Sequence, residues 1–73
     1  MVNVLAHYED GNYVECLHIT QISYMGYDKT VIVPEEELTS HLFPINQTLW
    51  FHSADGISVL SSKGLRCVKM VKE

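Results

Sequence analysis

A chain of 73 residues in which 47% are hydrophobic and 19% are charged has the composition of a folded protein, not of a disordered segment. Its length allows one domain, residues 1–73, with a thin core. The net charge of −4 is unevenly distributed: residues 1–62 hold eight acidic side chains against Lys29, whereas residues 63–73 hold four basic ones against Glu73. An acidic body argues against a general nucleic-acid reader, which needs a basic groove.

The N-terminal residues and the cysteines bear on location. The chain begins without the basic segment and long apolar run that a signal peptide requires. No segment approaches the roughly 18 consecutive apolar residues of a membrane helix. Two cysteines, Cys16 and Cys67, are too few for a disulfide framework. We therefore expect a cytoplasmic protein that contacts no membrane.

Short apolar segments separated by turn dipeptides dominate the first half of the chain. Residues 2–8 and 13–23 flank Asp10-Gly11, a strong hairpin signal, and are predicted to be strands. Residues 30–33 (TVIV) are all β-branched, which predicts a third strand.

The segment that begins at Pro34 predicts a short helix. Proline is favoured at the first helical position, and the three glutamates at 35–37 suit the positive end of the helix dipole. Leu38 and Leu42 are spaced to share one helical face. A second proline follows Phe43 and disfavours helical geometry there, so the helix should end by about that residue.

Three further strands are predicted, at 48–53 (TLWFHS), 57–62 (ISVLSS) and 65–71 (LRCVKMV). The last segment has a helical alternative, because basic residues recur at every third position from Lys63, but its valines and cysteine favour a strand. The predicted fold class is α+β, mostly antiparallel β, in the order ββ-β-α-βββ. A small barrel or a curved sheet that carries one short helix would accommodate this order.

The turn at residues 10–11 sets the register of the first hairpin. A two-residue turn places Val4 opposite Leu17, and a four-residue loop keeps that pairing. Three metal-capable side chains then share the face opposite the core: His7, Cys16 and His18. Such ligands can begin a zinc site, but structural zinc sites take ligands from tight Cys-x-x-Cys turns, which this chain lacks. We expect ordinary packing, with no metal and no cofactor.

The second hairpin is apolar on both faces. A two-residue turn at 55–56 places His52 opposite Val59 and Phe51 opposite Leu60. A sheet with one face in water alternates more cleanly, so either the rest of the chain covers both faces or one face is buried against another subunit. Aromatic side chains are enriched in binding hot spots, and the anchors assigned to such a contact are Tyr24, Tyr27, Trp50 and Phe51. The alternative for Trp50 is a place in the core.

The last predicted strand carries most of the basic residues of the chain. These side chains would guide the molecule onto an acidic partner, or would protect an exposed sheet edge against aggregation. The residues concerned are Lys63, Arg66, Lys69 and Lys72.

These features predict a small, non-enzymatic protein-interaction or regulatory protein that forms a homodimer and has an unknown protein partner. Accessory proteins of bacteria and phages share this build, an analogy at the level of the fold. Catalysis is not expected, because the chain lacks a glycine-rich phosphate loop and has little room for a substrate pocket. Two alternatives stay open. One is a nucleic-acid-binding β-barrel that uses the basic C-terminal strand, and the other is a metal-binding module that uses His7, Cys16 and His18.

Overall fold

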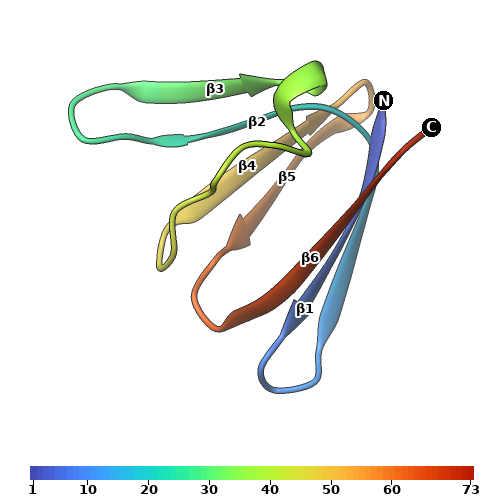
Figure 1. Cartoon of the computed structure of the whole chain (residues 1–73), viewed down its shortest axis with the longest axis vertical. Helices are drawn as coiled ribbons and strands as arrows, with labels where there is room; N and C mark the ends of the chain where they lie inside the picture. The colour runs from blue at the N-terminus through green and yellow to red at the C-terminus, as the bar shows by residue number, and fades with distance from the viewer.

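A computed structural model describes all residues, 1–73, and contains six strands and one 3-10 turn (Figure 1). Each predicted strand is confirmed to within two residues at its ends. The strands are β1 (Val2–Tyr8), β2 (Tyr13–Met25), β3 (Thr30–Pro34), β4 (Thr48–Ser53), β5 (Gly56–Ser61) and β6 (Leu65–Lys72).

The strands form one antiparallel sheet in the order β5-β4-β2-β1-β6. The first half of β2 pairs with β1, and its second half lies between β3 and β4. β5 and β6, at the two ends of this order, do not pair with each other, so the sheet is not closed. Of the two predicted forms, a small barrel or a curved sheet, the barrel is wrong. The chain termini lie side by side, and the Glu73 N–H donates to the Met1 carbonyl at 2.9 Å (Figure 1).

β2 bends where an extra residue enters its pairing with β1. Val2 pairs with Ile19, one residue further along β2 than the register of the rest of the hairpin requires. His18 has a φ of 58° at this bulge, and its N–H donates to Asn3 Oδ1 at 3.0 Å. The second half of β2 therefore runs away from β1 and pairs there with β3 and β4 (Figure 1).

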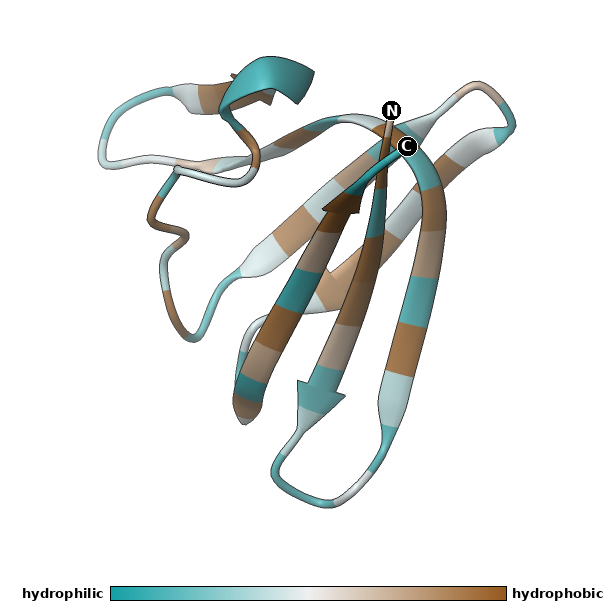
Figure 2. Cartoon of the chain, turned by 45° about the vertical axis from the view of Figure 1, so that its right-hand side comes forward, coloured by the Kyte–Doolittle hydropathy of each residue, from teal (hydrophilic) through white to brown (hydrophobic).

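The core lies on the concave side of the bent sheet, which we call the inner face. Along β1 the buried Val2, Val4 and Ala6 alternate with less buried residues, as in a strand with one buried face. Apolar and polar bands are mixed along β1, β2 and β6 (Figure 2). A single cluster of buried residues joins the two halves: Val2, Val4, Cys16, Ile19, Ile22, Tyr24, Val33, Leu38, Leu49 and Phe51.

The predicted helix is wrong, because only Glu35–Glu37 form a 3-10 turn. Leu38 is buried but Leu42 is 91% exposed, so the expected apolar helical face does not exist. The nine residues between Pro34 and Pro44 are too few to offset the cost of helix nucleation. Ser40 also donates its hydroxyl to the Glu37 carbonyl, which competes with helical pairing.

The predicted register of the first hairpin is wrong by one residue. Val4 pairs with Cys16, not with Leu17. The Tyr8 N–H donates to the Asn12 carbonyl at 2.9 Å, and Gly11 has a φ of +90°. These features define a three-residue loop with a bulged glycine, and an odd loop length moves every β2 side chain in the hairpin to the opposite face.

The predicted faces of the second hairpin are confirmed, although its pairing is shifted. The turn is Ala54-Asp55, and His52 pairs with Ile57 instead of Val59. A shift of two residues keeps each side chain on the same face. No helix in the chain is both long and apolar enough to cross a membrane.

Candidate protein-interaction surface

The side of β3, β2, β4 and β5 opposite the core carries an exposed apolar surface, which we call the outer face. Directly paired residues share one face of a sheet, and the pairs Ser23–Ile32, Ser23–Trp50 and Trp50–Val59 therefore make one row across all four strands. A second row runs through Pro34, Gln21, His52 and Ile57.

The apolar side chains of the outer face are largely open to solvent. Ile32 is 59% exposed, Ile57 58% and Val59 56%, and Met25 at the end of β2 is 54% exposed. Trp50 is half-buried among them. Contiguous exposed apolar side chains on a small protein typically mark a contact surface.

Two polar side chains at the centre of the outer face hydrogen-bond to each other. Ser23 Oγ lies 2.9 Å from His52 Nε2. Ser23 is 8% exposed, because it sits between the larger side chains of Ile32 and Trp50. This hydrogen bond gives each of the two side chains a partner. A serine–histidine pair is also the beginning of a nucleophilic site, but neither residue lines a cavity in which a substrate would bind.

One acidic residue lies at an end of the outer face. Asp55 is exposed in the turn that follows β4, beyond the row that contains His52. Glu36, which follows Pro34, instead borders a hollow with Val2 and Lys72 on the inner side. The two rows of the outer face thus contain no aspartate, glutamate, lysine or arginine, and the carboxylate of Asp55 lies at one end of them.

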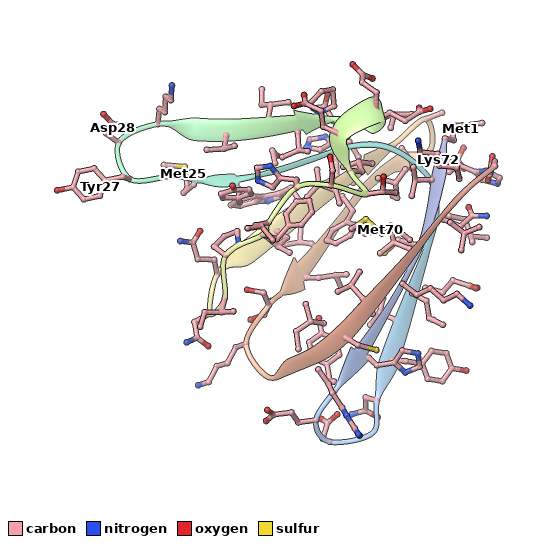
Figure 3. All side chains as sticks on the ribbon, in the orientation of Figure 1. Met1, Met25, Tyr27, Asp28, Met70 and Lys72 are labelled. Atoms are coloured by element: carbon pink, nitrogen blue, oxygen red, sulfur yellow. The ribbon has the colours of Figure 1, made fainter.

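The predicted aromatic anchors separate into core and surface residues. Tyr24 and Phe51 are buried in the core at 9% and 3% exposure, so their rings are not available to a partner. Tyr27 is fully exposed at the tip of the β2–β3 hairpin and points away from the body of the molecule (Figure 3). Trp50 is the one predicted anchor that lies on the outer face.

The basic residues near the C-terminus are exposed but do not share one face. Lys69 lies opposite Leu5, whereas Lys72 lies opposite the buried Val2, and these positions are on opposite sides of the sheet. Arg66 sits at an irregularity in the β1–β6 pairing, and Lys63 lies in the preceding turn. This distribution forms no continuous basic groove of the kind that follows a nucleic-acid backbone.

His7, Cys16 and His18 are not brought together. Cys16 is 5% exposed on the inner face, while His7 lies on the opposite side of the sheet beside Tyr13 and Cys67. His18 lies at the bulge, where its Nδ1 contacts the Glu73 carboxylate. No group of three or more metal-ligating side chains lies close together.

Burial raises the pKa of the Cys16 thiol, and a hydrogen bond with Ser58 partly opposes that shift. The pKa of Tyr8 is also raised, first by burial and then by the nearby Cys16 and Asp10. Both groups belong to the packing between the two halves of the sheet.

The open side between β5 and β6 is filled by apolar side chains. A cavity of about 30 Å³, room for roughly one water molecule, lies there among Ala6, Phe43, Leu60, Leu65, Val68 and Met70. Tyr8 closes one end, because its hydroxyl donates to the Ser61 carbonyl at 2.7 Å. Tyr24 and His41, with hydroxyl and Nε2 2.7 Å apart, pack with Phe43 on the same side of the sheet.

Sequence reasoning missed Ile32 as a surface residue. The run from Thr30 to Val33 is β-branched throughout, and such a run does not reveal which alternate residues face the core. Ile57 and Val59 were assigned to the same face as Trp50, which the pairing confirms. The sequence signal that could have identified the outer face is the set of residues that share a face with Trp50 on β4 and β5, because none of them is an aspartate, glutamate, lysine or arginine.

No family model matches the chain, and comparison with curated proteins and with solved structures gives no match.

Proposed function

We propose that this chain works by protein–protein contact, without catalysing a reaction, and that the outer face is its contact surface. The observation that carries the proposal is the row of Ile32, Ser23, Trp50 and Val59, which crosses four strands and leaves Ile32 and Val59 more than half exposed. A protein this small has little apolar surface to spare from its core, so an exposed row of this kind is best explained by a partner.

The chemistry of the surface defines the partner that it fits. The exposed side chains of Ile32, Ile57 and Val59 favour an apolar surface on the partner, with Trp50 as the anchor. Asp55 at one end favours a basic residue on that side of the partner. The partner is therefore a protein with an apolar patch that has lysine or arginine at its rim.

Affinity capture with paired variants tests this proposal. Trp50→Glu places a charge in the middle of the outer face, whereas Tyr27→Glu places the same charge on a fully exposed side chain at the hairpin tip. Each variant is first checked for folding by circular dichroism. We expect a protein from a lysate of the source cells to be retained by the wild type and by Tyr27→Glu, and to be reduced by about tenfold or more with Trp50→Glu. Equal retention by all three proteins, or no retention by the wild type, would contradict the proposal.

A further inference from the structure

β5 has a free edge whose backbone groups can be assigned. It pairs with β4 on one side only, and the two-residue turn closes on the pair Ser53–Gly56. Hydrogen bonding alternates along an antiparallel pair, so the backbone groups of Ile57 and Val59 point toward the free edge, while those of Ser58 point toward β4.

Two hydrogen bonds support this assignment. The Ser62 N–H donates to the Gln47 carbonyl at 2.7 Å, on the β4 side. The Ser61 carbonyl accepts from the Tyr8 hydroxyl at 2.7 Å, on the other side. The unpartnered stretch of the edge is thus Ile57 to Val59, before Tyr8 closes it.

The three free edges of the sheet differ in how they are protected. β6 carries Arg66, Lys69 and Lys72, and β3 ends in Pro34. Charged residues and proline are the usual means by which edge strands avoid pairing with other chains. β5 has no charged residue and no proline, and its register with β4 contains no bulge. It is the one edge of the three without such protection.

We propose that the β5 edge pairs antiparallel with the β5 edge of a second copy of this chain. The charges that flank β5 favour this arrangement, because Asp55 precedes the strand and Lys63 follows it. An antiparallel pair brings Asp55 of each copy to the same end as Lys63 of the other, whereas a parallel pair would bring like charges together. Between these residues the strand is neutral, so two identical edges meet without repulsion.

The exposed backbone groups fix the register of the pair. Ile57 of one copy exchanges hydrogen bonds with Val59 of the other, and the same exchange occurs on the other side of the two-fold axis, for about four bonds in total. Ser58 then lies opposite its own counterpart on the axis. The two outer faces become neighbours in one continuous sheet, with Ile57 of one copy beside Val59 of the other.

Amide hydrogen exchange of the wild-type protein, followed by NMR at two concentrations, tests this inference. The Ile57 and Val59 amides should exchange on the order of tenfold more slowly at a concentration that sedimentation shows to be dimeric. The Ser58 amide is already bonded to β4 and serves as the internal control, with little change expected. A dimer without added protection at Ile57 and Val59, or a strict monomer at millimolar concentration, would overturn the proposal.

A disulfide test gives a second, independent measurement. In a background of Cys16→Ala and Cys67→Ser, Ser58→Cys should form a covalent dimer under mild oxidation, because a non-hydrogen-bonded pair places the two Cα atoms about 4.5 Å apart. The control is Thr30→Cys on the β3 edge, which should stay monomeric. Dimers from both variants, or from neither, would contradict the proposed edge. The outer-face proposal is tested separately. If Trp50→Glu loses the captured protein but still forms the dimer, the β5-edge inference stands. If the dimer is absent but the captured protein is retained by the wild type and lost with Trp50→Glu, the outer-face proposal stands.

Discussion

Cys16 lies opposite Val4 across the β1–β2 hairpin, and this pairing places the thiol in the core. A shift of one residue would have placed the same thiol on the solvent side beside His7. The three-residue loop that ends in Gly11 decides between these arrangements. The chemistry of this cysteine thus follows from the length of a turn.

The two cysteines should differ in reactivity. Cys67 is exposed on β6, whereas Cys16 is buried and burial raises the pKa of its thiol. We expect a disulfide reagent at neutral pH to modify Cys67 at least about tenfold faster than Cys16. Cys67→Ser and Cys16→Val variants assign the two phases, and both thiols should react at once in denaturant. Fast modification of Cys16 in the native protein would show that the hairpin register is different.

The raised pKa of Cys16 also has a consequence for stability. Between the ordinary thiol pKa, near 8.5, and the higher pKa in the folded state, the unfolded chain has lost this proton while the folded chain retains it. The contribution of Cys16 is therefore complete below pH 8.5 and is lost as the pH rises through the folded-state pKa. We expect the free energy of unfolding, measured by urea denaturation, to fall above that pH. The free energy of unfolding of the Cys16→Val variant should fall less steeply with pH. The same slope in the variant and in the wild type would contradict this prediction.

Phe51 and Trp50 are neighbours on β4 that face opposite sides of the sheet, and they should respond differently to truncation. Phe51 is 3% exposed in the core, so Phe51→Ala should cost about 3–5 kcal/mol. Trp50 is half-buried on the outer face, so Trp50→Ala should cost no more than about 1–2 kcal/mol. Urea denaturation of both variants measures the difference. A larger cost at Trp50 would mean that the assignment of the two faces is reversed.

Gly11 should be the most sensitive position in the first loop. Its φ of +90° is costly for other residues, although an added Cβ would meet no atom within 4 Å. Gly11→Ala should therefore destabilise the protein by about 1–2 kcal/mol through the backbone alone. The control, Glu9→Ala in the same loop, should change stability by less than about 0.5 kcal/mol. Equal effects of the two substitutions would argue against the bulged loop.

Strand positions were predictable from this sequence, whereas the register of the first hairpin was not. Segments such as Thr30–Val33 are β-branched, and turn dipeptides bound the strands of both hairpins, so local preference and tertiary structure agree. The loop between Tyr8 and Tyr13 is compatible with two, three or four residues. Only a loop with an odd number of residues places Cys16 in the core. The composition of the loop does not show whether that number is odd or even.

The predicted helix is absent because the sequence signals for it concern only the N-terminal end of a helix. Pro34 and the glutamates at 35–37 start a turn, but the segment has no second buried residue one turn beyond Leu38. The loop to β4 instead places Phe43 against Tyr24, a contact between residues far apart in sequence. Such contacts depend on the bend of β2, for which the sequence holds no recognised signal.

The sequence predicted which residues of the candidate surface share a face, but not that this face is the exposed one. Alternation along β4 and β5 identified the residues that share a face with Trp50, and the pairing confirms them. It did not identify the buried face, because Leu49 and Phe51 are as apolar as Trp50 and Val59. That choice depends on which side of the sheet receives β1 and the loop from Leu38 to Gln47.

Site-specific photo-crosslinking in cells tests most directly whether the outer face is a contact surface. A photoreactive phenylalanine analogue is placed at Ile32, which is 59% exposed on the outer face and lies away from the β5 edge. The matched control is Leu17, which is 47% exposed on the other half of the sheet. The proposed function predicts a discrete crosslinked protein from Ile32 and none from Leu17. Crosslinks from Leu17 alone, or from neither position, would contradict it.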